Sequence, residues 1–194
     1  MSNVNSLPVV NHLIEGLPSK GRELFLQGCE TVHLEFGSVL CQRGQKFLHV
    51  YFPITGFILL VTNINSHPPL ELGLIGNQGM LGGMFSLGVN RVPLRAHAQG
   101  SGTALSMPTA LFRQELRSNL SWLRLLNRYF YVLLAQLGQF AACNRFHEVD
   151  ARLARWMLMT HDRAHSDGFH LPHQFLANML GVQRSAVTIA AGVL

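Results

Sequence analysis

The chain has 194 residues, of which 48% are hydrophobic and 13% are charged. This composition excludes an intrinsically disordered chain and is sufficient for one large domain or two small ones, each with its own core. Fifteen Lys and Arg against ten Asp and Glu give a formal net charge of +5, which permits an anionic partner without specifying one. Only one positive charge of this excess lies in residues 145–194, where five Arg face four acidic residues, so the C-terminal segment by itself does not favour DNA.

Cysteine usage and apolar patterning both indicate the reducing cytoplasm. Cys29, Cys41 and Cys143 are an odd number of cysteines without a Cys-x-x-Cys pair, which argues against a disulfide framework or a cysteine metal cluster. The run MSNVNSLPVVNHLIEGLP has neither a basic start nor a long apolar stretch, so no signal peptide is expected. Residues 122–146, the most apolar helical candidate, contain three Arg. No segment supplies the ~20 apolar residues of a membrane span, so no membrane partner is expected.

Residues 31–107 are rich in β-forming residues and glycine. The short runs TVHLEF, HVYFPI, GFILLVTN and LELGLIG are each bounded by turn signals, among them Arg43-Gly44-Gln45 and Gly76-Asn77-Gln78-Gly79. Short strands at this spacing, with glycine at the corners, predict a β-barrel or a β-sandwich.

Helical patterns begin after Pro108. A short helix is predicted over residues 109–116, and a long one starts with Ser121 as its N-cap and reaches about residue 146, which is ~39 Å at 1.5 Å per residue. One apolar stripe follows it in steps of three and four, and we interpret it as a dimer seam because so long a helix usually has a partner along its length. The alternative is a helix packed on the β-domain of its own subunit. The stripe consists of Leu123, Leu126, Phe130, Leu133, Leu137 and Phe140.

The C-terminal residues have the pattern of a helix-turn-helix. A helix over residues 149–161 and a loop over residues 162–168 precede the closing run FLANMLGVQRSAVTIAAGVL. Pro172 suits a first helical turn, and Gly181 stands where the turn requires an unusual backbone angle. The remaining positions agree with this pattern: Leu176, Met179 and Leu180 share one face, Ala177 permits close approach, Val182 fills the corner, and Val187, Ala190 and Ala191 are expected to face inward.

The start of the second helix carries candidate DNA-binding residues: Gln183, Arg184, Ser185 and Thr188. In a DNA-binding pair the second helix enters the major groove with its N-terminal residues at base edges. Arg pairs twice with guanine, Gln with adenine, and Ser or Thr with a base or a phosphate. The alternative is an ordinary helical hairpin with a polar outer face.

These segments together resemble the Crp/Fnr superfamily of bacterial transcription regulators. The resemblance is closest in AACNRFHEVDARLARWMLMTHDR and LPHQFLANMLGVQRSAVTIAAGVL, because one branch of the family carries very similar CNR-x-H, RLARW and LA-x-MLGV-x-R strings. VYFP and GNQGMLGG in the β-rich half are also similar to that branch.

The resemblance implies an α+β fold in three parts. Residues 1–117 would form a cyclic-nucleotide-binding-like, jelly-roll-like β-roll with a sensory role, and residues 118–146 a long central dimerisation helix. Residues 147–194 would form a truncated winged-helix DNA-binding domain, with the helix-turn-helix at about 172–194. It further implies a homodimer that binds double-stranded pseudo-palindromic operators with half-sites ~34 Å apart. RNA polymerase and an unknown small-molecule effector are further candidate partners.

The sequence departs from the family at the cyclic-nucleotide pocket. Family members that bind cyclic nucleotides have a Gly-Glu pair, whose carboxylate holds the ribose, and an Arg with a small neighbour, which hold the phosphate. The first pair falls at Gly82-Gly83 and the second near Val92-Pro93 in this sequence, so the carboxylate and the phosphate ligands are absent. Arg91 and Arg95 flank that position and could shift in. Because an unpaired phosphate in a partly buried pocket is costly, we expect no tight binding of cyclic nucleotides, and no cofactor is predicted.

A second departure lies at the C-terminus. Family members continue past the second helix with a β-hairpin wing that packs on it, whereas the printed sequence ends with Leu194. A helix-turn-helix lacking its wing would expose an apolar edge around Val187, Ala191 and Val193 and would lose part of its electrostatic affinity for DNA.

Other chemistry is less well supported. His161, His165, His170 and His173 cluster where a helix is expected to end, and Cys143 and His147 stand four apart, but neither set has a recognised metal spacing in context. His147-Glu148 lacks the second histidine of a zinc protease, and the glycines of residues 76–83 do not open a βαβ helix. We therefore expect no metal site and no enzyme.

The second hypothesis for the function, after a DNA-binding regulator, is a ligand-binding or oligomerising β-roll that no longer binds DNA. Third is a metal-dependent β-roll enzyme using His33, His49 and His97.

Overall fold

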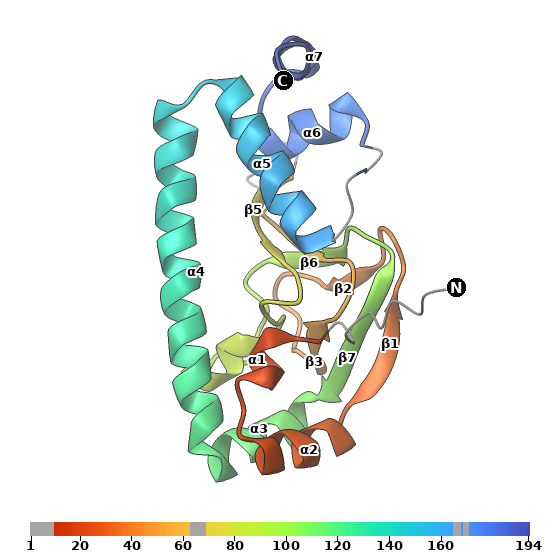
Figure 1. Ribbon diagram of the computed structural model, residues 1–194, viewed down its shortest axis with the longest axis vertical. Helices are drawn as coiled ribbons and strands as arrows, with labels where there is room; N and C mark the ends of the chain where they lie inside the picture. Colours follow the sequence, from red (N-terminus) through yellow and green to blue (C-terminus); the bar gives the residue numbers. More distant parts are fainter. Residues whose placement is uncertain (1–9, 63–68, 165–167, 169–170) are drawn as a thin grey trace, which may run out of the picture.

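The computed structural model describes residues 10–62, 69–164, 168 and 171–194, and its strands form two antiparallel sheets (Figure 1). Buried side chains of both sheets belong to a single core, so the sheets pack face to face as a β-roll. One sheet has the order β1-β7-β3 and consists of Glu30–Leu34, Gly102–Pro108 and His49–Pro53. The other has the order β2-β6-β4-β5 and consists of Val39–Cys41, Arg95–Ala98, Ile58–Thr62 and Leu70–Ile75.

The four strand-forming runs singled out in the sequence correspond to β1, β3, β4 and β5. Pattern analysis missed β2, β6 and β7, which complete the sheets. Ala96, Ala98 and Ala104 in β6 and β7 are fully buried. Small residues of this kind fill the space between closely packed sheets, but they carry no strong strand preference. These strands are therefore defined by pairing with distant partners rather than by their own composition.

Three short helices and the start of a long one close the lower end of the β-roll in Figure 1. They are α1 (His12–Glu15), α2 (Ser19–Gln27), α3 (Thr109–Ser118) and α4 (Leu120–Phe146), with a 3-10 turn, η1, at Gly83–Leu87. At this end Phe25, Phe52, Phe112 and Trp122 form an aromatic cluster in which the Phe25 and Trp122 ring centroids are 4.7 Å apart. The cluster joins the N-terminal helices, β3 and α4 into one body.

The long helix α4 has 27 residues and runs along one side of the molecule. Asn119 rather than Ser121 caps it, because the Asn119 side chain accepts a hydrogen bond from the Ser121 N–H at 3.0 Å. Its inner face is anchored by Tyr129, whose hydroxyl lies 3.3 Å from both the backbone nitrogen and the carbonyl oxygen of Met80.

The apolar stripe predicted as a dimer seam is divided between two environments. Leu126 is fully buried in the core of the β-roll, and Phe130 and Leu133 pack against that core. These three residues face their own subunit, so assigning them to a partner was wrong. Leu123 and Leu137 are exposed, and the Phe140 ring lies 4.8 Å from the guanidinium carbon of Arg155. Helical spacing identifies one face correctly but does not state which body covers it.

Three further helices, α5 (Val149–Ala164), α6 (His173–Leu180) and α7 (Arg184–Ala191), pack above the β-roll in Figure 1. Their shared core contains the fully buried Leu153, Ala177 and Val187. Helix α5 includes residues 162–164, which the sequence analysis predicted as part of a loop. Gly181 adopts a left-handed conformation with φ of 64° at the end of α6, as the turn was predicted to require.

Candidate DNA-binding helix and ligand cavity

The turn between α6 and α7 presents the start of α7 to the solvent. The Val182 N–H donates to the Ala177 carbonyl at 2.9 Å, which closes the turn after Gly181. Gln183 then serves as the N-cap residue of α7. Helix α7 lies at the end of the molecule opposite α2 and α3 (Figure 1), so a long ligand such as a duplex can approach it.

The four predicted DNA-binding residues are all exposed at this end of α7: Gln183, Arg184, Ser185 and Thr188. The Thr188 hydroxyl donates to the Arg184 carbonyl at 3.1 Å and lies 3.0 Å from Nδ1 of His173, which holds its side chain close to α6. Sequence reasoning missed Ile189, which is 72% exposed and follows Ser185 by one helical turn. An exposed apolar side chain beside polar ones suits contact with a thymine methyl group.

The structure differs from the predictions for the apolar residues of α7 at two positions. Val187 is fully buried in the three-helix core, so it is not part of an exposed edge. Ala191, which was expected to face inward, is exposed together with Val193. The inward face of α7 is therefore Val187 and Ala190, at a spacing of three, and Ala191 lies one step beyond it.

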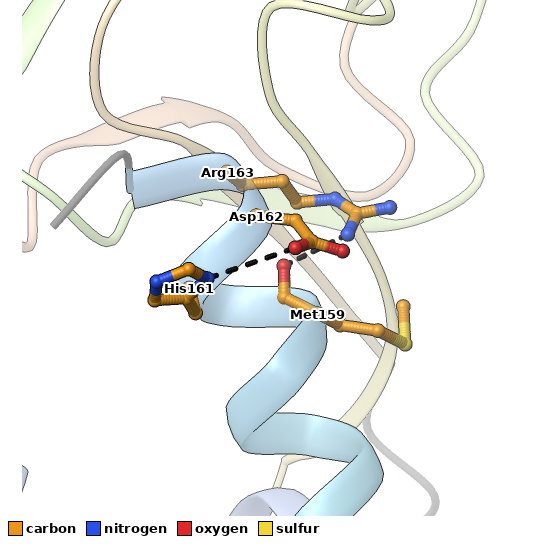
Figure 2. Close-up of polar contacts among 4 residues, drawn as sticks. All are labelled: Met159, His161, Asp162 and Arg163. Atoms are coloured by element: carbon orange, nitrogen blue, oxygen red, sulfur yellow. Dashed lines mark hydrogen bonds and ion pairs between the residues drawn. The ribbon is translucent and has the colours of Figure 1, made fainter. Parts of the chain in front are cut away.

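The three-helix unit contacts the β-roll through a buried polar pair and an apolar patch. The indole N–H of Trp156 on α5 donates to the Glu71 carboxylate on β5, and both side chains are buried. Arg163 at the end of α5 is also buried and donates to the Met159 carbonyl at 2.8 Å (Figure 2). Met179 packs with Phe57, Leu59, Val61 and Leu74 of the β-roll. This contact fixes the orientation of α6 and α7 relative to the sheet.

Burial raises the pKa of Glu71 from its ordinary 4.5 to about 7, against the lowering effects of the Trp156 hydrogen bond and of Arg155 and Arg163. Between these two pH values the folded chain keeps a proton that the unfolded chain releases. Stability contributed by this group therefore falls as pH rises through the window from about 4.5 to about 7.

Replacing Glu71 with Gln is expected to remove this pH dependence. Glutamine keeps an acceptor for Trp156 but is never charged, so the variant should gain up to about 3 kcal/mol over the natural chain at pH 8 and little at pH 4.5. Urea unfolding at pH 4.5, 6 and 8 measures the difference, with Glu35→Gln on an exposed carboxylate as the control. Parallel pH profiles for the natural chain and Glu71→Gln would contradict the prediction.

A cavity of about 320 Å³, the α4 cavity, lies between α4 and the β-roll. Gly82 and Gly83, the predicted pocket residues, line it. Gly82 has φ of 100°, and a Cβ atom added to Gly83 would lie 3.3 Å from Cζ of Phe130. The Phe130 ring thus stands where a glutamate at position 83 would extend its side chain.

The two arginines expected to flank this pocket lie elsewhere. Arg91 is exposed and its guanidinium donates to the Gly44 carbonyl at 2.7 Å. Arg95 is exposed and borders a separate hollow with Arg43 and Thr62. Neither Arg91 nor Arg95 is among the residues that line the α4 cavity, so the idea that they shift in to hold a phosphate finds no support in their positions.

Metal-ligating residues are dispersed in the described part of the chain. Within residues 10–62, 69–164, 168 and 171–194, no three His, Cys, Asp or Glu side chains come together as a metal site would require. His161 Nδ1 lies 3.7 Å from the Asp162 carboxylate (Figure 2), and both are exposed. His165 and His170 lie outside the described residues. In the same part of the chain, no helix has the length and apolarity needed to span a bilayer.

A two-sheet β-roll followed by a long helix and a terminal helix-turn-helix defines the fold of the Crp/Fnr transcription regulators, and the chain has this α+β fold. No protein-family model matches the sequence, and no curated protein matches it either.

Three solved structures illustrate the similarity. The c-di-GMP-responsive global regulator CLP of Xanthomonas campestris is 16% identical with a TM-score of 0.72, and the match covers 91% of each chain. A chain described as a Crp/Fnr-family transcriptional regulator from Eubacterium rectale is 14% identical with a TM-score of 0.73, over 93% of this chain and 85% of that one. FixK2 of Bradyrhizobium japonicum is 13% identical with a TM-score of 0.70, over 86% and 84%.

Proposed function

We propose that the chain is a transcription regulator that binds a pseudo-palindromic DNA operator as a homodimer and responds to a small-molecule effector other than a cyclic nucleotide. The observation that carries this proposal is the exposure of Arg184, Ser185, Thr188 and Ile189 along the start of α7, at one end of a Crp/Fnr-type fold. These residues supply polar and apolar contacts suited to base edges. Such a regulator would act in the cytoplasm, with RNA polymerase as a further partner.

Dimerisation is assigned to the outer face of α4, which we call the outer seam. Tyr131 and Leu134 are 75% and 70% exposed, although large apolar side chains of this kind favour burial. Leu120 and Leu134 are two heptads apart, and Tyr131 and Gly138 one heptad apart, as in a two-helix seam. A Cβ atom added to Gly138 would touch nothing within 4 Å, so the second helix can approach closely there. The outer seam consists of Leu120, Tyr131, Leu134, Gly138 and Ala141.

DNA binding is tested first by selecting duplexes from a randomised library with the full chain. A homodimer should enrich sequences with two-fold symmetry and half-sites one helical turn, about 34 Å, apart. Binding of the enriched duplex should weaken as salt rises, because counterions are released from the phosphates. Asymmetric or unenriched sequences, with weak binding at both low and high salt, would favour the β-roll module that does not bind DNA.

Replacing Arg184 with Ala is expected to weaken binding of the selected duplex by ~1–3 kcal/mol and to relax base preference at one position in each half-site. The reason is that Arg184 is exposed at the N-terminal end of α7, where its guanidinium can pair with a guanine. Fluorescence anisotropy at two salt concentrations measures the change. The matched control is Arg117→Ala, which removes an exposed arginine of α3 at the far end of the molecule. Equal affinities for Arg184→Ala and the natural chain would remove Arg184 from base contact.

A further inference from the structure

The α4 cavity has a lining that differs chemically from a nucleotide site. Its wall is made by strands of the β-roll, by residues around η1 and by the inner face of α4. At about 320 Å³ it falls within the size range of small-molecule sites, roughly 300–1,000 Å³. Six of the side chains that line it are Phe47, Leu60, Ile75, Met80, Phe130 and Leu133, which are hydrocarbon or thioether groups without charge.

Two lining side chains carry a titratable group, and both stay neutral near pH 7. Burial raises the pKa of the Cys41 thiol to about 11. It also raises the pKa of the Tyr129 hydroxyl to about 12, and this hydroxyl is already engaged by the backbone of Met80. No Lys, Arg, His, Asp or Glu is among the residues that line the cavity in the described part of the chain.

Burying an ionised group without a partner is costly, whereas burying hydrocarbon surface is favourable by roughly 25 cal/mol per Å². The lining therefore disfavours a phosphate or a carboxylate and favours an uncharged, mostly apolar molecule. The volume is about twice that of a ~150 Å³ protein cavity that accommodates benzene.

We propose that the α4 cavity binds a small uncharged molecule with a predominantly hydrocarbon body, of the size of two rings or a chain of about ten carbons. The assignment of this molecule as the effector rests on the proposed function as a regulator.

The position of the cavity couples such a ligand to the outer seam. Phe130, Leu133 and Leu137 of α4 line it, and Leu134 both borders it and belongs to the outer seam. A ligand that fills the cavity therefore contacts the inner face of the helix whose outer face is proposed to meet the partner. By its differential affinity it would shift the population of α4 arrangements.

The test uses N-phenyl-1-naphthylamine, an uncharged fluorophore whose emission rises in apolar surroundings, with the full chain in its solution oligomeric state. Saturable binding of one probe per chain is expected. Decanol should displace the probe, whereas decanoate, which has the same chain length but a charge, should compete at least about tenfold more weakly. Cyclic AMP should not compete.

Two cavity-filling variants locate the probe. Leu60→Trp and Leu133→Trp place bulk at two different walls of the cavity, and each should weaken probe binding at least about tenfold while leaving the circular dichroism spectrum unchanged. Because a variant that fails to fold gives no binding result, two variants at different walls keep the test decisive. Leu111→Trp, on the exposed surface of α3, is the control and should bind the probe as the natural chain does.

Three results would overturn the proposal: no saturable binding, equal competition by decanoate and decanol, or unchanged affinity in both folded cavity variants. The first would arise if side chains of a partner fill the cavity, and the last if the probe sits on the outer seam. None of these readouts involves DNA. Saturable probe binding without operator binding would therefore reject the proposed function but keep the ligand site, and the reverse result would do the opposite.

Discussion

Replacing Tyr131 with Glu is expected to convert the proposed homodimer into monomers and to weaken operator binding by at least about 100-fold, because a bivalent complex becomes a monovalent one. Tyr131 is 75% exposed in the subunit, so the substitution should not disturb the fold of the monomer. In the proposed outer seam it would place two carboxylates in an apolar contact between helices, where burial of charge is strongly unfavourable.

Analytical ultracentrifugation measures the oligomeric state, and anisotropy with the selected duplex measures binding. Val132→Glu, the next residue along α4 and also exposed, is the matched control. It points about 100° away around the helix and should leave the dimer intact. A dimeric Tyr131→Glu chain would show that the outer seam is not the interface. Phe130→Glu does not suit this test, because Phe130 packs on the core of the β-roll and the variant would lose stability for another reason.

Replacing Trp122 with Ala is expected to lower the free energy of unfolding by about 3–5 kcal/mol, the usual cost of removing a large aromatic side chain from a core. Trp122 is fully buried. Its ring centroid lies 4.7 Å, 5.7 Å and 5.6 Å from those of Phe25, Phe52 and Phe112. It therefore holds the first turn of α4 against α2, β3 and α3, and its loss should also loosen the base of the outer seam.

The matched control is Trp122→Phe, which keeps an aromatic ring in the cluster. The Trp122 indole N–H finds no hydrogen-bond partner in the described part of the chain, so phenylalanine loses volume but removes a buried, unpaired donor. We expect a cost below about 1.5 kcal/mol. Urea unfolding followed by circular dichroism at one protein concentration compares the three chains. Similar costs for the two substitutions would show that the cluster does not depend on the ring at this position.

Several features of the molecule follow from short-range pattern alone. Gly181 lies between two amphipathic segments, and only a residue that tolerates a positive φ angle suits that turn. Its observed φ of 64° agrees with the prediction made from spacing. The glycine-bounded β-runs and the helical patterns after Pro108 similarly predicted a β-rich half followed by a helical half, whereas the α+β fold in three parts was implied by the family resemblance. The family resemblance placed the ribose-binding Gly-Glu pair at Gly82-Gly83, where the carboxylate is absent, and this predicted a departure from nucleotide binding. Both glycines line the α4 cavity.

The sequence pattern alone could not show which part of the protein covers a given apolar helix face. Helix α4 carries apolar residues on more than one side, and its periodicity is the same whether Leu126 and Phe130 meet a partner or the β-roll. The structure assigns them to the β-roll and exposes Tyr131 and Leu134 instead. Val187 was predicted to lie on an exposed apolar edge of α7, yet residues of α5 and α6 bury it.

The remaining features of the site depend on contacts between residues that are far apart in the sequence. Glu71 and Trp156 are 85 residues apart, and nothing in either local sequence indicates that a carboxylate of β5 meets an indole of α5. Arg91 and Arg95 are close to the pocket in sequence, but the direction of β6 and the loop before it places their side chains outside the cavity. Local propensity and spacing thus define the elements and their turns. Which faces touch, and whether a cavity is charged or apolar, depends on packing between distant segments, because burial is a property of the whole fold.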